Sequence, residues 1–227
     1  MAKLSIIIPA LDEGEEIVAT LDRLAHLRAL GVEVIVVDGG SHDATVQRAR
    51  MRSDRVISAP RGRASQMNAG AVKASGDVLL FLHADTRLPD DAEHLVLGGL
   101  DRAGRVWGRF DARIEGKRPL LSLVAWFMNV RSRITGIATG DQAIFVRRDA
   151  FNAVGGFPPI PLMEDIAVSK QLKRRSPPLC LRELVVTSGR RWERNGIFST
   201  ILLMWWLRLA FFFGADPKKL ARRYGYE

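Results

Sequence analysis

Residues 1–100 alternate aliphatic runs with segments of helical periodicity, and this alternation constrains the fold more than any other feature. Three runs have the β-branched and aliphatic character of strands buried on both faces: residues 4–8, 32–37 and 78–82. Between the first two runs, apolar residues recur at helical spacing from Ile17 to Leu27, and a second helix is expected over residues 64–75. The order predicts an α/β fold with a mainly parallel central sheet and helices on both faces.

Acidic residues gather where the predicted strands end. Asp12 and Glu13 follow the first strand, Asp38 and Asp43 the second, and Asp85 a later one. Each carboxylate alone fits a helix N-cap or first turn. Because ligands of such sheets bind beyond the carboxyl ends of the strands, the three loops together predict one acidic rim, suited to a metal ion and to the hydrogen-bond donors of a base and a ribose.

Length and cysteine content limit the class of protein. A chain of 227 residues forms one compact domain with appendages. Its single cysteine, Cys180, cannot form an intrachain disulfide, and four scattered histidines make no structural zinc site. The N-terminal residues reach acidic positions too early for a signal peptide. We therefore expect a cytoplasmic protein.

Charge is distributed unevenly along the chain. The net charge is +9, but residues 1–100 carry 11 basic and 14 acidic side chains, whereas residues 101–227 carry 23 and 11. The second half, at +12, is expected to face phosphate groups, lipid headgroups or nucleic acid. A solvated basic face explains the charge alone equally well.

Five segments in this order resemble family 2 inverting glycosyltransferases of GT-A fold: residues 5–13, 36–45, 77–85, 163–165 and 190–192. The resemblance covers residues 4–194, and within the family the chain is similar to the selenodomain-associated transferases. It implies a GT-A catalytic domain over residues 1–195, with a donor half of about 1–100 and an acceptor half of about 101–195. An apolar helical segment with a basic tail, residues 196–227, follows.

The resemblance also implies the residues that bind a nucleotide-diphosphate sugar. Asp38 would accept the imide hydrogen of a uracil, while Ala10 and Glu13 frame the base and ribose. The family gathers further nucleotide and phosphate contacts at the positions of Arg61, Arg63, Gln66 and Asn68. Guanidinium groups suit phosphate oxygens, although solvated arginines on a loop are the alternative.

His83-Ala84-Asp85 stands at the family's Asp-X-Asp metal motif, with histidine in place of the first acid. Asp85 is implied to bind Mn²⁺ or Mg²⁺. One carboxylate suffices because diphosphate oxygens and waters complete the coordination. For His83, packing or a ribose contact ranks ahead of a contact with the ion.

Glu164 and Asp165 open a predicted helix, where acids complement the helix dipole. The resemblance implies that Asp165 is the general base for the acceptor hydroxyl and that Glu164 supports it. The metal and Arg191 would stabilise the departing nucleoside diphosphate, which gives a single displacement with inversion.

Arg190-Arg191-Trp192 resembles the end of the Gln/Arg-X-X-Arg-Trp motif of processive sugar polymerases, but Ser188 occupies its first position. We therefore expect non-processive transfer of one sugar. Trp192 is either a platform for the acceptor or a buried core residue.

Two apolar stretches, residues 120–130 and 197–213, remain. The first is short, and Arg208 interrupts the second, so neither reaches the roughly 20 apolar residues of a membrane span. They contain Trp126, Trp205 and Trp206 and have basic flanks. This pattern favours contact with the anionic inner face of the cell membrane and a lipid-linked acceptor, with a core helix or a homodimer contact as alternatives.

Other function classes fit less well. The first strand is not followed by the glycine-rich turn of nicotinamide enzymes, and no P-loop is present. A non-catalytic basic module that binds anionic lipid or nucleic acid is the best rival, but it leaves the carboxylate motifs unexplained. The sequence predicts a metal-dependent glycosyltransferase without a nucleic-acid partner.

Overall fold

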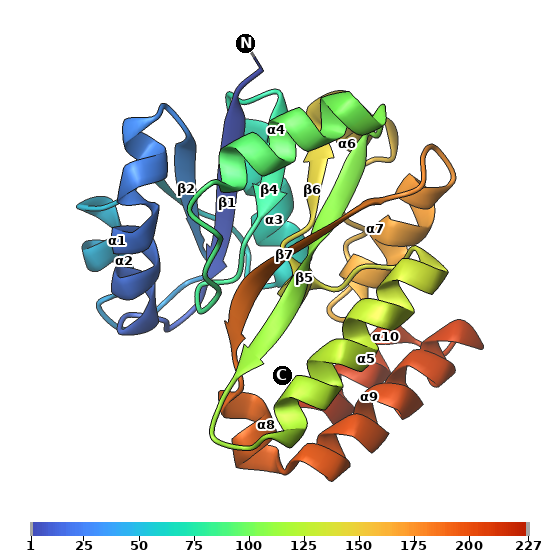
Figure 1. Ribbon diagram of the computed structural model, residues 1–227. Helices are drawn as coiled ribbons and strands as arrows, with labels where there is room; N and C mark the ends of the chain where they lie inside the picture. The colour runs from blue at the N-terminus through green and yellow to red at the C-terminus, as the bar shows by residue number, and fades with distance from the viewer. Residues whose placement is uncertain (1, 226–227) are drawn as a thin grey trace.

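The computed structural model describes residues 2–225 and contains a seven-stranded sheet in the order β3-β2-β1-β4-β6-β5-β7 (Figure 1). The strands are β1 Leu4–Ala10, β2 Glu33–Asp38, β3 Arg55–Ser58, β4 Val78–Phe81, β5 Trp107–Glu115, β6 Phe145–Arg147 and β7 Leu179–Ser188. The helices are α1 Glu16–Ala29, α2 Thr45–Arg50, α3 Arg63–Lys73, α4 Ala92–Ala103, α5 Leu120–Thr135, α6 Arg148–Ala153, α7 Glu164–Lys173, α8 Arg190–Asn195, α9 Ile197–Phe212 and α10 Pro217–Tyr224, with a 3₁₀ turn at Gly140–Gln142.

One strand interrupts an otherwise parallel sheet. β6 runs antiparallel to both of its neighbours, β4 and β5, while β1, β2, β3 and β4 pair in parallel and β7 pairs in parallel with β5. The carboxyl ends of the six parallel strands therefore share one edge. This arrangement confirms the predicted α/β class and the mainly parallel sheet.

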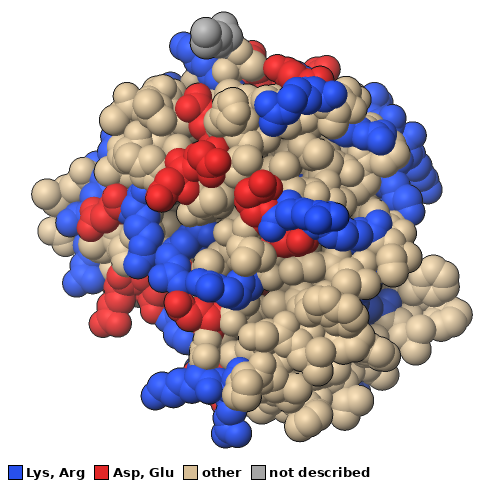
Figure 2. All heavy atoms as spheres, viewed as in Figure 1, with Lys and Arg blue, Asp and Glu red and all other residues tan. Residues whose placement is uncertain are grey.

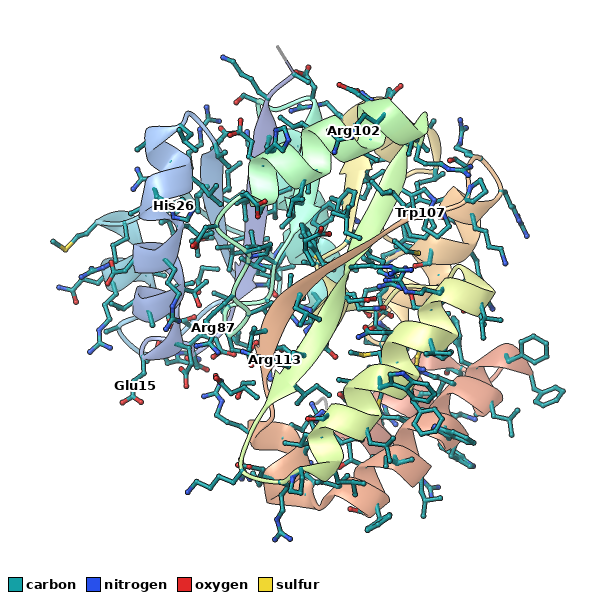
Figure 3. The ribbon with its side chains drawn as sticks, viewed as in Figure 1. Glu15, His26, Arg87, Arg102, Trp107 and Arg113 are labelled. Atoms are coloured by element: carbon teal, nitrogen blue, oxygen red, sulfur yellow. The ribbon has the colours of Figure 1, made fainter. Side chains whose placement is uncertain are left out.

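The sheet is buried on both faces, as the aliphatic runs indicate. Ile6 and Ile8 pack with residues of α1, α2 and α4, whereas Ile7 between them packs with residues of α3, α6 and α7. Alternate side chains of a strand point to opposite faces, so β1 needs apolar residues at successive positions. On the second face, Trp107 in β5 is fully buried, and its indole N–H donates to the carbonyl of Ser176 at 2.7 Å (Figure 3).

The last two helices, α9 and α10, pack against the start of α7. Leu207 of α9 and Leu220 of α10 share a buried cluster with Leu162, Met163 and Ile166, which lead into and begin α7. At the start of α10 the Asp216 carboxylate accepts the backbone N–H of Lys218, a helix N-cap. None of the helices within residues 2–225 is long and apolar enough to cross a membrane.

Candidate active site

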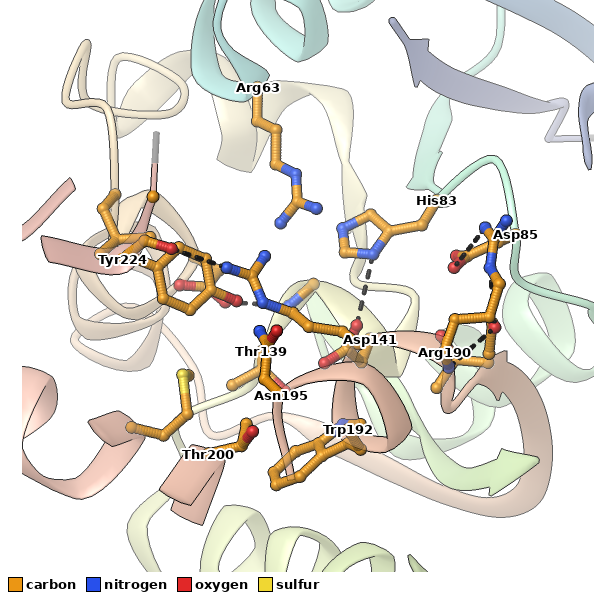
Figure 4. Close-up of a pocket in the computed structure, with 18 of the residues that line it drawn as sticks. Arg63, His83, Asp85, Thr139, Asp141, Arg190, Trp192, Asn195, Thr200 and Tyr224 are labelled. Atoms are coloured by element: carbon orange, nitrogen blue, oxygen red, sulfur yellow. Dashed lines mark hydrogen bonds and ion pairs between the residues drawn. The ribbon is translucent and has the colours of Figure 1, made fainter. Parts of the chain in front are cut away.

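A pocket of about 1120 Å³ lies where the end of β4, the start of α7 and helices α8 to α10 meet (Figure 4). Seven of the predicted site residues line it: Arg63, His83, Asp85, Glu164, Asp165, Arg191 and Trp192. The first and last of them, Arg63 and Trp192, are more than a hundred residues apart in the chain, so the fold brings them together.

The β4 end supplies an imidazole and a carboxylate. His83 Nδ1 lies 3.4 Å from an oxygen of Asp141, and Asp85 Oδ2 lies 3.6 Å from a guanidinium nitrogen of Arg190 (Figure 4). Burial raises the pKa of Asp85, and the charge of Asp141 raises it further against the opposing charges of His83 and Arg63. Asp85 therefore stands in a desolvated position that favours a cationic ligand.

Arg190 bridges that carboxylate to the first loop. Its guanidinium lies 3.8 Å from Glu13 and contacts Glu16 as well as Asp85. Burial, followed by the charge of Asp85, raises the pKa of Glu13. Because the Arg190 side chain is 56% exposed, its ion pairs are individually weak and can be exchanged for another cation.

The start of α7 presents the two adjacent acids differently. Glu164 is buried, and burial together with the charge of Asp165 raises its pKa to about 7. Asp165 accepts the N–H of Gly140 on Oδ2 at 2.9 Å and that of Ile166 on Oδ1 at 2.7 Å. Met163, which precedes them, has a φ of 70°, a left-handed conformation uncommon for a residue with a side chain. Both carboxylates line the pocket, and Glu164 is the more deeply buried of the two.

Gly140 lies between His83 and Asp165. A Cβ at this position would stand 2.5 Å from His83 Nε2, so the imidazole can take its place only against a glycine. The neighbouring Asp141 pairs with the same imidazole. Sequence reasoning missed both residues; the available signal was a Gly-Asp pair a few residues before the short strand β6.

The C-terminal helices form the opposite wall. Arg191 donates to the carbonyl of Tyr224 at 2.8 Å, and its guanidinium lies 3.5 Å above the Tyr224 ring. Trp192 lines the pocket, and its half-buried side chain packs against the apolar cluster that contains Leu121. Its role as a platform for the acceptor stays a prediction. Arg208 of α9 also lines the pocket. The sequence analysis treated it only as an interruption of an apolar run.

A second group of predicted donor residues lies outside the pocket, at the ends of β1 and β2. Ala10 and Asp38 are direct partners in the parallel register. The Asp38 carboxylate accepts the N–H groups of Gly40 and Ser41, which shapes the loop after β2. Gln66 donates both amide hydrogens to protein carbonyls, those of Ala10 and Val37 at 2.8 Å each. A donor contact by Gln66 stays a prediction that rests on its side-chain oxygen.

Two further predicted donor residues lie away from these groups. Arg61 is exposed in the loop before α3 and does not line the pocket. Asn68 pairs with the backbone of Phe157, accepting its N–H at 2.9 Å and donating to its carbonyl at 2.8 Å. Their roles in donor binding remain predictions.

The β4 end fits a hard divalent cation that is shared with a ligand. Among residues 2–225, no three His, Cys, Asp or Glu side chains form a cation cage. A metal held between an enzyme and a diphosphate needs fewer protein ligands, however, because phosphate oxygens and waters complete its coordination. Asp85 offers a carboxylate for this purpose, and the guanidinium of Arg190 shows that a cation is accepted between Asp85 and Glu13.

The sequence profile described as "Glycosyl transferase family 2" matches residues 5–154. Poly-beta-1,6-N-acetyl-D-glucosamine synthase of Staphylococcus aureus is 25% identical over 219 residues, covering 85% of this chain and 52% of the synthase. The synthase of Staphylococcus epidermidis is 26% identical over the same coverage. The chain thus spans about half the length of the curated relatives it matches.

Solved structures share the fold. The S. aureus TarS fragment 1–349 in complex with UDP-GlcNAc superposes with a TM-score of 0.66 at 17% identity, covering 82% of this chain and 58% of that one. The mannosyltransferase PcManGT from Pyrobaculum calidifontis, in complex with GDP-Man and Mn²⁺, has a TM-score of 0.63 at 20% identity, with coverages of 82% and 56%. At these identities the likeness establishes the architecture, which is the predicted GT-A arrangement.

Proposed function

The chain belongs to glycosyl transferase family 2, and we propose that it transfers a sugar from a nucleotide-diphosphate donor to an acceptor hydroxyl with inversion at the sugar carbon. The observation that carries the proposal is the placement of Asp165, which Gly140 holds in a pocket that also contains Asp85 and several arginines. A base and charges suited to a diphosphate therefore line one cavity.

We propose a uridine donor. Ala10 and Asp38 end β1 and β2, Gln66 of α3 binds the Ala10 carbonyl, and together they offer carbonyl and carboxylate oxygens to a base. Glu13 pairs with Arg190, which lines the pocket. Uracil presents an imide N–H that a carboxylate accepts. The TarS fragment that shares the fold binds UDP-GlcNAc, which supports the same choice.

The diphosphate of the donor would lie among Arg63, Arg191 and the β4 end. Asp85 would hold Mn²⁺ or Mg²⁺, with His83 beside it and Arg190 displaced toward solvent. When bound, the ion neutralises the negative charge that develops on the departing diphosphate. Arg191, which Tyr224 holds in place, lies where it can stabilise the same charge.

Asp165 acts as the general base in this proposal. It removes the proton of the acceptor hydroxyl while that oxygen forms a bond to the anomeric carbon and the bond to the diphosphate breaks. The two N–H groups that it accepts fix its orientation. With a pKa of about 7, buried Glu164 retains a proton near neutrality, so the adjacent acids need not both carry charge.

The remaining proposals concern how sugars are added and where. Trp192 would be the platform for the acceptor, and because Ser188 replaces the first residue of the processive motif, we propose a single addition.

We also propose that the protein works on the inner face of an anionic membrane. Figure 2 shows a broad uncharged area over α5 and α9. Its exposed apolar residues include Leu123, Trp126, Phe127, Phe198, Leu202, Trp205, Leu209 and Phe212.

Release of nucleoside diphosphate from a panel of UDP- and GDP-sugars, with Mn²⁺ or Mg²⁺, tests the activity. The wild type is expected to cleave a UDP-sugar slowly with water as acceptor, and Asp165→Asn is expected to lose this reaction. Cleavage by neither protein together with no nucleotide binding would exclude the proposed function. Equal cleavage by both would exclude Asp165 as the base.

A further inference from the structure

Arg208 is the one charged residue in α9, whose other side chains are apolar or hydroxylic. It lines the pocket with Thr200 and Met204, which precede it by two turns and one turn of the same helix face. The Nε atom of Arg208 is buried, and no hydrogen-bond partner for it lies within residues 2–225. The Arg208 guanidinium therefore lines the pocket and has at least one N–H group without an acceptor among the described residues.

Arg131 of α5 is another half-buried arginine, whose charge interacts with that of Arg208. Its Nε and Nη2 atoms are likewise buried without a hydrogen-bond partner in the described part of the chain. Burial, followed by the charge of Arg208, lowers the pKa of Arg131 to about 10. The two guanidinium groups are therefore close enough to repel each other.

This arrangement is unfavourable for the ligand-free protein. Buried polar groups normally find a hydrogen-bond partner, and a buried charge without one costs more than a neutral group. An anion in the pocket beside Arg208 would supply acceptors for its guanidinium and would offset the repulsion from Arg131. Phosphate oxygens match a guanidinium in two places, which makes phosphate the best-fitting anion.

Arg208 lies near the proposed base. It lines the same pocket as Asp165, and its charge interacts with Asp165 and Asp141. Arg208 is therefore placed to bind a group of the acceptor whose hydroxyl Asp165 would activate.

We propose that Arg208, backed by Arg131, binds a phosphate group of the acceptor, so that the acceptor is a phosphate-bearing alcohol whose hydroxyl is presented to Asp165. This inference rests on the proposed function of the pocket. The phosphate can belong to a soluble molecule or to a lipid headgroup. The second source is compatible with the exposed apolar side chains on the outer face of α9, such as Leu202 and Trp205.

Calorimetric titration of the full chain, saturated with UDP and Mn²⁺, tests the site with glycerol 3-phosphate as the probe. Wild-type protein is expected to bind it saturably. Arg208→Met and Arg131→Met should weaken this binding by about tenfold to a hundredfold, the effect of losing a hydrogen bond to a charged group. Arg208→Lys should retain part of the affinity, because lysine keeps the positive charge but cannot donate two parallel hydrogen bonds as a guanidinium does. Arg182→Gln, an exposed position of β7, is the matched control and should bind like the wild type.

Vesicles distinguish the two sources of the phosphate. If the acceptor is a lipid, the wild type should sediment with phosphatidylcholine vesicles that contain phosphatidylglycerol, and Arg208→Met should reduce that sedimentation more than Arg182→Gln does. Binding of glycerol 3-phosphate or of these vesicles that depends on Arg208 supports the inference. Binding of neither probe, or binding that is equal in Arg208→Met and Arg182→Gln, overturns it.

UDP affinity, measured in the same variants, separates this inference from the function itself. Arg208→Met is expected to bind UDP as tightly as the wild type, because the proposal places Arg208 at the acceptor and not at the donor diphosphate. Loss of UDP binding in Arg208→Met would assign the arginine to the donor diphosphate and overturn the inference. Failure of the wild type itself to bind UDP would instead contradict the proposed function.

Discussion

The backbone N–H of Gly140 donates a 2.9 Å hydrogen bond to Asp165 Oδ2, and the same residue has no room for a Cβ because His83 Nε2 would lie 2.5 Å from it. One glycine between α5 and β6 therefore joins the end of β4 to the start of α7. The metal motif and the proposed base depend on each other's position through this residue.

Gly140→Ala should therefore damage the site more than the fold. The new methyl group must displace the His83 imidazole or the loop that holds Asp165, and a misplacement of about 1 Å can cost roughly a hundredfold in rate. Nucleotide-sugar cleavage by the variant should fall by about that factor. The control is Gly98→Ala in α4, where only the flexible end of Arg102 is nearby and a helical alanine is favourable. Equal activity of the two variants would contradict the role of Gly140.

Asp165→Asn should separate catalysis from donor binding. The amide keeps the shape of the carboxylate but cannot take the acceptor proton, so the transfer rate should fall by roughly two to four orders of magnitude. UDP affinity, measured by calorimetry, should stay within a factor of about two because Asp165 lies on the acceptor side. A fully active Asn variant would remove Asp165 from the mechanism.

Glu164→Gln should change the pH dependence of stability. The raised pKa means that the folded protein holds the Glu164 proton more tightly than the unfolded chain does, so stability falls as pH rises from the unfolded value of 4.5 through about 7. Glutamine removes this loss. Urea unfolding should find Glu164→Gln more stable than the wild type at about pH 8, by up to roughly 3 kcal/mol, with the difference vanishing near pH 4.5.

The exposed Glu183→Gln in β7 controls for the removal of one carboxylate. The difference in stability between Glu183→Gln and the wild type should not change between acidic and alkaline pH. A difference between Glu164→Gln and the wild type that stays constant from pH 4.5 to about pH 8 would mean that Glu164 is already ionised in the folded protein.

Leu202→Gln tests the membrane proposal. Leu202 in α9 is 70% exposed and Leu30 after α1 is 66% exposed, so the same substitution at the two positions alters the fold equally little. Only Leu202→Gln should reduce sedimentation with anionic vesicles, because only that leucine belongs to the α5 and α9 surface. Added salt should weaken wild-type binding without abolishing it, since the apolar contribution is not screened. If Leu202→Gln leaves vesicle binding unchanged but dissociates a dimer, the surface is a contact between two copies.

Local patterns predicted much of the donor half. The aliphatic runs became β1, β2 and β4, and the predicted helix over residues 64–75 appears as α3 at Arg63–Lys73. Periodicity predicts these elements because the spacing of their apolar residues matches the faces that are buried. In β1, for example, Ile6 and Ile8 pack on one face of the sheet and Ile7 packs on the other.

The residues that were missed depend on contacts between distant segments. No local pattern indicates that position 140 must be a glycine to fit beside the His83 imidazole, or that the Tyr224 carbonyl accepts a hydrogen bond from Arg191. Gln66 is a different case: the resemblance implied a donor contact for it, and the structure adds that its amide hydrogens bind the carbonyls of Ala10 and Val37, which leaves its side-chain oxygen for a ligand. Arg208 did leave a signal, since a single charge within an apolar helix is costly unless it faces a polar cavity.

The central claim is that the carboxyl edge of the sheet binds a nucleoside diphosphate with a divalent cation, and calorimetric titration with UDP tests it most directly. The account predicts that UDP binds the wild type, that Mn²⁺ strengthens the binding, and that Asp85→Ala loses the metal-dependent gain. It further predicts that Asp38→Ala weakens binding of UDP with or without the metal. Absence of UDP binding, or equal binding with and without Mn²⁺ by the wild type, Asp85→Ala and Asp38→Ala, would contradict it.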